Sequence, residues 1–259
     1  MQSMDPKDVP APSVQNKCST CSLSKICIPD HLSGAGLEEL EQVLESSTLY
    51  QNGAAIFSAG QHFDRIYAVK SGMVKTVTLD QDGKEFIDGF HLPGEVFALD
   101  AIYPGKYLST AYSIGTSAVC SIDFATLEHL ASHLPRLQHQ IFELLSKAVH
   151  KSHEFQVELT AEQKLAGFIL NLSRRFKMRG YSDIRMNLIM PRRDIANHLN
   201  MVPETVSRLF KAFQQSGVIS IDRTDLAILS PSKLASIAVG DHSIRRANKN
   251  DQENEVKRA

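Results

Sequence analysis

The segment RDIANHLNMVPETVSRLF, from Arg193 to Phe210, has the pattern of two short helices joined by a tight turn. Apolar residues in its first half share one helical face, and a second apolar set recurs from Val206 onward. Proline suits the first turn of a helix, where its missing N–H has no intrahelical partner, so Pro191 and Pro203 mark two helix starts. The pattern predicts a helix-turn-helix, with helices over residues 191–199 and 203–216.

The outer face of the second helix carries side chains that can read base edges in DNA. Glu204, Ser207 and Arg208 lie near its N-terminus, which is the part of a recognition helix that meets bases. Arginine can clamp guanine, glutamate can accept from cytosine, and serine can bond either way. We therefore predict these three residues as base contacts. The alternative is a solvated helix face with ordinary surface charges.

Local charge supports a phosphate-facing domain in this part of the chain. Residues 174–223 contain ten Lys or Arg and four Asp or Glu, a balance of +6 in a chain whose formal net charge is −1. Clustered cations are typical of nucleic-acid-binding surfaces. The predicted contacts to the DNA backbone are Arg192, Arg193 and Lys211.

The flanks of this segment complete a winged domain. The run Thr160-Ala-Glu-Gln163 is a capping-box pattern that opens a helix continuing to Gly180. A short strand is predicted over residues 185–190 and a two-stranded wing over 218–229. The winged helix-turn-helix domain is thus expected to span residues 160–240, followed by a polar tail, residues 241–259, that is predicted to be disordered.

A different pattern occupies the middle of the chain, from about residue 49 to residue 122. Short apolar stretches there alternate with glycines, which indicates an all-β sandwich or barrel. Asp82-Gly83 is a hairpin-turn signal. A short helix is expected before it, over residues 37–44. Residues 1–17 are polar, contain three prolines and are predicted to be disordered.

A long helix is predicted over residues 135–159. Apolar residues 137, 141, 144 and 148 form one stripe, which would pack on the β-domain. The neighbouring stripe would contact a partner helix, and its members are Phe142, Leu145, Val149, Ser152 and Gln156. The alternative is a single broad buried face.

Three of the four cysteines fall within ten residues, at Cys18, Cys21 and Cys27, and the fourth is Cys120. Thiolates bind soft metal centres, and three local ligands with a distant fourth can hold an iron–sulfur cluster. Zinc on the same residues, a thiol redox sensor and a plain buried Cys120 are the alternatives. No secretory signal is visible, so a reducing cytoplasm is expected, where metal binding or redox sensing is commoner than disulfide formation.

Other classes of protein find little support in the sequence. No apolar run approaches the length of a membrane span. The Walker A loop, the Gly-x-Ser-x-Gly elbow and the His-Glu-x-x-His motif of enzymes are all absent from the sequence. The pairs His129/His133 and His150/His153 have helical spacing that suits a metal, but such pairs are usually just solvated. The chain is therefore not expected to be an enzyme.

Taken together, these residues resemble the fumarate-and-nitrate-reduction regulator family, a branch of the cyclic-AMP receptor protein superfamily. The resemblance covers the chain from Cys18 to about Leu229. It rests on the joint occurrence of the Cys-x2-Cys-x5-Cys spacing, Gly89-Phe-His-Leu-Pro-Gly94, Val119-Cys120, Asn171-Leu-Ser-Arg-Arg-Phe176 and Glu204-Thr-Val-Ser-Arg208.

The resemblance implies a cytoplasmic bacterial transcription factor. In the family, an oxygen-labile [4Fe-4S] cluster on four cysteines promotes a homodimer that binds a TTGAT-N4-ATCAA palindrome in double-stranded DNA and contacts RNA polymerase. Carried over by position, Cys18, Cys21, Cys27 and Cys120 would be the cluster ligands. Glu204, Ser207 and Arg208 would read the bases. The alternative is a regulator of the same superfamily that responds to another signal, with the cysteines holding zinc or sensing redox state.

The resemblance also implies an α+β fold. A β-roll like those that bind cyclic nucleotides, with the cysteine loop, would span residues 18–134, and the dimerisation helix would span residues 135–159. Nucleotide-binding rolls of the superfamily carry an Arg and a Glu after their Pro-Gly turn. Segments 94–100 and 108–111 lack the matching Arg and Glu, so no cyclic nucleotide is expected to bind. Ser152 stands where the family commonly has an aspartate, and the stretch before Thr160 is a few residues short.

Overall fold

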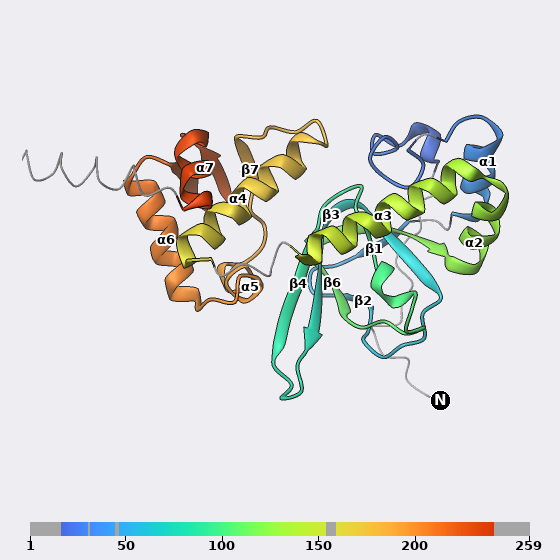
Figure 1. The fold of residues 1–259 in the computed structure, drawn as a ribbon, viewed down its shortest axis with the longest axis horizontal. Helices are drawn as coiled ribbons and strands as arrows, with labels where there is room; N and C mark the ends of the chain where they lie inside the picture. The colour runs from blue at the N-terminus through green and yellow to red at the C-terminus, as the bar shows by residue number, and fades with distance from the viewer. Residues whose placement is uncertain (1–16, 31, 45–46, 154–158, 241–259) are drawn as a thin grey trace, which may run out of the picture. The chain divides into compact units, whose positions relative to one another are not determined.

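The computed structural model describes residues 17–30, 32–44, 47–153 and 159–240. The chain divides into two compact units, residues 1–156 and 157–259 (Figure 1). Each unit has its own antiparallel sheet and its own helices. No helix in the described part of the chain is long and apolar enough to cross a membrane.

The first unit is built on a six-stranded antiparallel sheet. Its strands follow the order β1-β6-β3-β4, with β2 also paired to β6 and β5 also paired to β3. They are β1 (Thr48–Tyr50), β2 (Ala55–Phe57), β3 (Arg65–Leu79), β4 (Glu85–His91), β5 (Val96–Phe97) and β6 (Thr110–Asp123).

The pairing of β3 with β6 organises this sheet. Its register runs from Arg65 opposite Asp123 to Val77 opposite Thr110, with shifts on both sides of Ser71. Gly72 lies at the second shift with φ +80°, and a Cβ there would come within 2.5 Å of the Ser117 hydroxyl oxygen. Only glycine fits that backbone, because both its conformation and its surroundings exclude a side chain.

The turn between β3 and β4 confirms the predicted hairpin. The Asp80 side chain accepts hydrogen bonds from the N–H groups of Asp82 and Lys84, at 2.9 and 2.8 Å. Gly83 takes φ +78°, which a tight turn requires and glycine adopts without strain.

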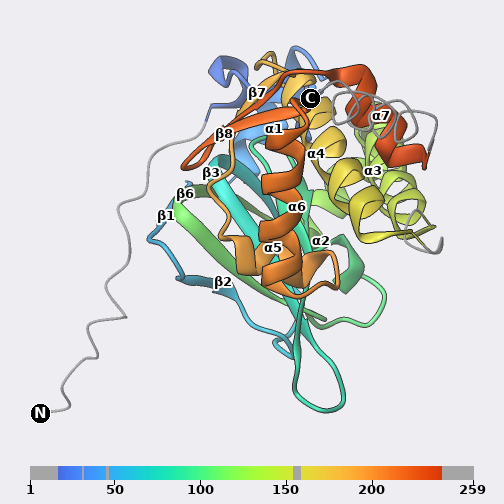
Figure 2. The ribbon, with the colours of Figure 1, turned by 90° about the vertical axis from the view of Figure 1, so that its left-hand side faces the viewer.

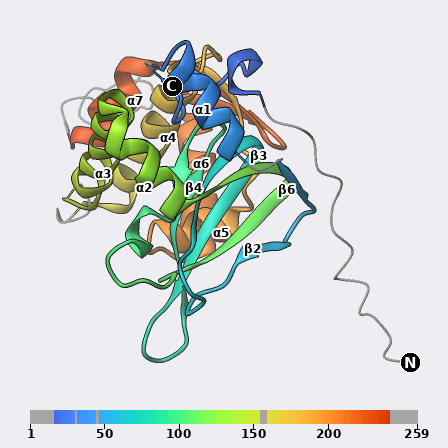
Figure 3. The ribbon, with the colours of Figure 1, turned by 90° about the vertical axis from the view of Figure 1, so that its right-hand side faces the viewer.

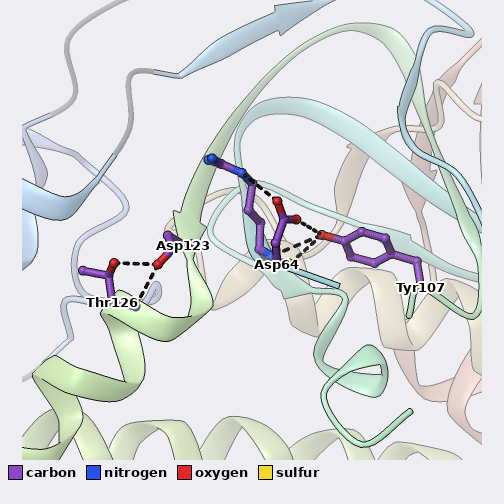
Figure 4. Close-up of polar contacts among 5 residues, drawn as sticks. Asp64, Tyr107, Asp123 and Thr126 are labelled. Atoms are coloured by element: carbon purple, nitrogen blue, oxygen red, sulfur yellow. Dashed lines mark hydrogen bonds and ion pairs between the residues drawn. The ribbon is translucent and has the colours of Figure 1, made fainter. Parts of the chain in front are cut away.

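Aromatic side chains fill the interior of the roll. Phe57 stacks on Tyr107 and on Tyr67, with ring centroids 4.1 and 5.2 Å apart. The Tyr107 hydroxyl donates to the Arg65 carbonyl at 3.0 Å and lies 3.2 Å from the Asp64 carboxylate (Figure 4). A buried tyrosine thus keeps its polar end satisfied while its ring packs in the core.

Three helices complete the first unit: α1 (Ala35–Val43), α2 (Phe124–His133) and α3 (Pro135–His153). The short 3-10 turns η1 (Cys18–Thr20) and η2 (Leu99–Ala101) lie outside them. Asp123 caps α2 by accepting from the Thr126 N–H at 2.8 Å (Figure 4). Figures 1 and 3 show η1, α1, α2 and the start of α3 gathered at one end of the sheet.

Among its described residues, the second unit has four helices, which Figure 2 labels, and a three-stranded sheet of order β7-β9-β8. Its helix α4 begins with the predicted capping box, in which Thr160 and Gln163 satisfy each other's backbone N–H. The elements are α4 (Ala161–Lys177), β7 (Arg185–Asn187), α5 (Arg192–His198), α6 (Pro203–Gln215), β8 (Ile219–Asp222), β9 (Asp225–Ile228) and α7 (Pro231–Val239).

The predicted α+β fold class is confirmed, and several details differ from the predictions. The strand expected over residues 185–190 ends at Asn187, and Pro191 is the N-cap of α5 rather than its first residue. Ala148, predicted on the inward stripe of α3, is exposed. The predictions for residues 1–16, 154–158 and 241–259, Gln156 among them, lie outside the described residues.

Candidate cysteine site and DNA-reading surface

Consecutive backbone turns fold the cysteine loop. The Cys21 N–H donates to the Cys18 carbonyl, and the Ser24 N–H donates to the Cys21 carbonyl, both at 3.1 Å. A third turn is closed by the Asp30 N–H on the Cys27 carbonyl at 3.0 Å. The three local cysteines therefore sit on a loop with defined backbone bonds.

The fourth cysteine lies on a strand of the sheet. Cys120 belongs to β6 and stands opposite Ala68 of β3. All four cysteines are free thiols and keep part of their surface accessible. The strand supplies a rigid position for one thiol, and the loop supplies the other three.

The thiols influence one another electrostatically. Burial, followed by negative charge on Cys120 and Cys21, raises the pKa of Cys18 to about 12. Burial likewise raises the pKa of Cys27 to about 12; the Ile28 N–H opposes the shift, and the charges of the other three cysteines add to it. Although each residue is partly exposed, the Cys18 and Cys27 sulfurs are poorly hydrated, so their thiolates need a positive partner.

Three contacts hold the cysteine loop in place. The Ser19 N–H donates to the Glu41 carboxylate of α1 at 2.6 Å. Gln140 of α3 donates to the Cys27 carbonyl at 2.9 Å. Ile26 packs against Gly94, where an added Cβ would lie 2.8 Å from the isoleucine side chain. Glu41 and Gln140 were not predicted, because nothing in the local sequence distinguishes them from other polar helix residues.

Four thiols are a donor set that an iron–sulfur cluster can use. Among the residues described, no three His, Cys, Asp or Glu side chains converge closely enough to hold one metal ion. A zinc ion requires such convergence, with Zn–S bonds of about 2.3 Å. A [4Fe-4S] cluster binds each cysteine through a different iron, so its ligand sulfurs stand farther apart. The chemistry of four thiols, three on one loop and one on β6, fits such a cluster.

The outward stripe of α3 is apolar and open. Phe142 and Val149 are each 59% exposed, and Leu145 is half-buried. The inward stripe packs on the roll, with Leu137 buried and Ile141 and Leu144 against the same core. Ser152 lies within α3, and its side chain is not among the described ones.

The recognition element has the predicted inner and outer faces. Val206, Phe210 and Phe213 of α6 are buried. The three predicted base contacts, Glu204, Ser207 and Arg208, are exposed near the N-terminus of the same helix. The Ser207 hydroxyl donates to the Pro203 carbonyl at 2.9 Å and still has lone pairs to accept with.

The predicted phosphate contacts differ in exposure. Arg193 and Lys211 are exposed. Arg192 is half-buried, and its guanidinium carbon lies 3.8 Å from the centroid of the Phe210 ring. Desolvation lowers the Arg192 pKa, as expected for a cation stacked against the inner face of the helix pair.

These two units define a class of protein, a DNA-binding transcription regulator in which a β-roll precedes a winged helix-turn-helix. Residues 163–237 match the Crp-like helix-turn-helix domain family, and residues 48–133 match the cyclic nucleotide-binding domain family. The chain is 38% identical over 224 residues to the fumarate and nitrate reduction regulatory protein of Salmonella typhimurium. That alignment covers 85% of this chain and 90% of the relative, and the Escherichia coli protein gives the same values.

The chain therefore belongs to the fumarate and nitrate reduction regulator family of the cyclic-AMP receptor protein superfamily, and it is a regulator rather than an enzyme. Solved structures share the fold. FixK2 from Bradyrhizobium japonicum gives a TM-score of 0.66 at 24% identity, covering 74% of this chain and 96% of that one. A putative cAMP-binding regulatory protein from Silicibacter pomeroyi gives 0.60 at 20% identity, covering 86% and 99%.

Proposed function

We propose that this protein is an oxygen-responsive transcription regulator whose Cys18, Cys21, Cys27 and Cys120 hold a [4Fe-4S] cluster. The observation that carries the proposal is the set of four free thiols, three on one loop and one on strand β6, whose charges raise the pKa of Cys18 and Cys27. When bound, the cluster would supply a redox-active centre that oxygen can convert. The chain itself supplies a partly exposed cysteine loop and thiolates that need a positive partner. It also supplies the contacts with Glu41, Gln140 and Gly94 that hold this loop in place.

A cluster bound at this site is proposed to promote a homodimer formed through α3. The exposed Phe142 and Val149 with Leu145 give this helix an apolar stripe that a second copy would cover. A two-fold dimer would place two α6 helices on the two halves of a TTGAT-N4-ATCAA-like palindrome. A monomer would read one half-site and lose the benefit of the second. RNA polymerase is the expected further partner at anaerobic genes, which the dimer would activate or repress.

The roll is proposed to bind no cyclic nucleotide, although its fold is shared with proteins that do. Phe57, Tyr67, Phe97 and Tyr107 occupy the interior as a stacked cluster. Segments 94–100 and 108–111 contain no arginine, and they have no glutamate at the position that matches the ribose-binding one. We place the protein in the reducing cytoplasm, where its thiols remain available for metal.

Substitution of the distant ligand tests the proposal. Anaerobically reconstituted Cys120→Ser is expected to lose the cluster, measured as iron and acid-labile sulfide per chain. Ala118→Ser is the matched control, because it adds a hydroxyl two residues away on the same strand, and it should load like the wild type. The second unit should stay folded by circular dichroism in both variants. Unchanged iron in Cys120→Ser would refute the ligand assignment, and stoichiometric zinc in place of iron would favour the structural-metal alternative.

A further inference from the structure

A hydrogen bond joins the cysteine loop to helix α3. The side-chain amide of Gln140 donates to the carbonyl of Cys27 at 2.9 Å, across 113 positions of sequence. Gln140 is only 7% exposed, and its Oε1 has no hydrogen-bond partner among the described residues. A buried amide with half its capacity unused costs free energy. Stability of the fold alone therefore does not account for a glutamine at this position.

The bond reaches a ligand sulfur through one peptide group. The Cys27 carbonyl and the Ile28 N–H belong to the same peptide unit, and this N–H lowers the pKa of the Cys27 thiol, as a donor to its sulfur would. A donor on the carbonyl polarises the peptide and makes its N–H a stronger donor. Hydrogen bonds to ligand sulfurs are among the factors that set the properties of iron–sulfur clusters.

The other end of the link lies on the helix with the open apolar stripe. Gln140 is on the inward face of α3, next to the fully buried Leu137, and Phe142 faces outward two residues later. Ile28 belongs to the same buried core as Leu137. A movement of the Cys27–Ile28 peptide therefore acts directly on the packing of α3.

We propose that Gln140 is a positioning residue that fixes the Cys27–Ile28 peptide against α3 and so couples the cysteine site to the association of that helix. This inference rests on the proposed function and adds a residue-level connection to it. Gln140 touches no ligand sulfur itself. It acts by holding the Cys27–Ile28 peptide through the Cys27 carbonyl, and Gln140 would lose this bond if the peptide turned.

The test replaces the amide in the full-length protein and compares cluster-loaded with apo samples. Gln140→Leu removes the donor and the unpartnered acceptor together. The Cys27 carbonyl keeps a partner, because the Asp30 N–H also donates to it at 3.0 Å. Gln140→Met is a second test variant, which preserves the length of the side chain. Gln42→Leu, on the exposed face of α1, is the matched control.

Both Gln140 variants are expected to load iron and sulfide, and their apo forms should melt no lower than the wild type. Sedimentation gives the dimer Kd of the apo protein and that of the cluster-loaded protein. The first divided by the second should fall by about fivefold to tenfold in the variants, which is the equivalent of one hydrogen bond. An Fe–S(Cys) stretching band in resonance Raman should shift upward as the N–H to sulfur bond weakens. A purely structural residue would lower the melting temperature instead and leave this band in place.

Wild-type values of the Kd ratio and the Raman band in both variants would overturn the inference while leaving the proposed function intact. A drop in apo melting temperature, with a Kd ratio unchanged from the wild type, would also overturn it. If the wild type itself takes up no iron and sulfide, or dimerises equally with and without them, the proposed function fails and the coupling fails with it.

Discussion

The guanidinium of Arg192 stacks on the ring of Phe210, with the guanidinium carbon 3.8 Å from the ring centroid. Arg192 opens α5 and Phe210 is a buried residue of α6, so the contact ties the two helices of the DNA-reading element together. Arg192 was predicted as a contact to the DNA backbone. Its position gives it a structural role inside the domain in addition to any contact with phosphate.

Arg192→Ala should therefore destabilise the second unit. A partly desolvated cation–π contact contributes about 1–2 kcal/mol, so the free energy of unfolding should fall by that order. Arg193→Ala is the control, since the Arg193 side chain is 80% exposed and water screens its 3.5 Å contact with the buried Asp194; the expected change is below about 1 kcal/mol. Urea unfolding of the apo protein measures both. Equal destabilisation by the two variants would contradict the structural role.

Arg208 and Lys211 should differ in how their loss affects DNA binding. Both are exposed on α6, but Arg208 lies nearer the N-terminus, where base edges are read. Arg208→Ala should reduce discrimination against a substituted base pair by about 1–3 kcal/mol. Lys211→Ala should weaken binding to all sequences and reduce the salt slope by about 1. Fluorescence anisotropy on palindromic and substituted duplexes at several salt concentrations measures both quantities. Sequence-independent loss for Arg208→Ala would remove it from the base contacts.

Phe142→Ala should weaken dimerisation without unfolding the monomer. Because Phe142 is 59% exposed in a single chain, truncation leaves no cavity, and unfolding should change by less than about 0.5 kcal/mol. At a two-fold interface each protomer loses its Phe142 contact, so the dimer Kd should rise by at least about tenfold. Leu79→Ala, which trims another exposed apolar side chain, is the control. Sedimentation of the cluster-loaded protein decides the question, and an unaffected Kd would place the interface elsewhere.

The buried thiols make apo stability sensitive to alkaline pH. Folding raises the pKa of Cys18 and Cys27 from 9.0 to about 12, so the native state retains protons that the unfolded chain has lost. The stability contributed by these thiols is fully present below pH 9.0, the pKa of the thiols in the unfolded chain. It is lost as the pH rises through about 12, their pKa in the folded protein. Denaturation midpoints between pH 8 and about 11 should therefore fall more steeply for the wild type than for Cys18→Ser/Cys27→Ser. Parallel slopes would contradict the burial of these sulfurs.

The sequence predicted the helix-turn-helix closely because its signals are local. Pro203 marks the start of α6, and the apolar period from Val206 to Phe213 defines its buried face. The box at Thr160 and Gln163 likewise marked the start of α4. Helices α5 and α6 end within a residue of their predicted bounds, since caps and periodicity are read from neighbouring residues.

Features that depend on distant residues were beyond sequence reasoning. The shifted register of β3 against β6 around Ser71 arises from pairing between strands 40 or more positions apart, and no local signal encodes it. The hydrogen bonds of Glu41 to Ser19 and of Gln140 to Cys27 also join remote segments. The four cysteines were found because their residue type is rare and chemically specific. The helix residues that anchor their loop were not, because glutamate and glutamine are ordinary on helices.

We propose that a cluster on the four cysteines controls DNA binding. The most direct test of this claim is the absorption spectrum and iron and sulfide content of anaerobically purified protein, before and after air, with a gel shift on a TTGAT-N4-ATCAA duplex at fixed salt. We predict a brown protein with about four irons per chain that bleaches in air and loses the shifted band. Colourless protein, or DNA binding unaffected by air, would contradict the claim and leave a regulator whose cysteines serve another signal.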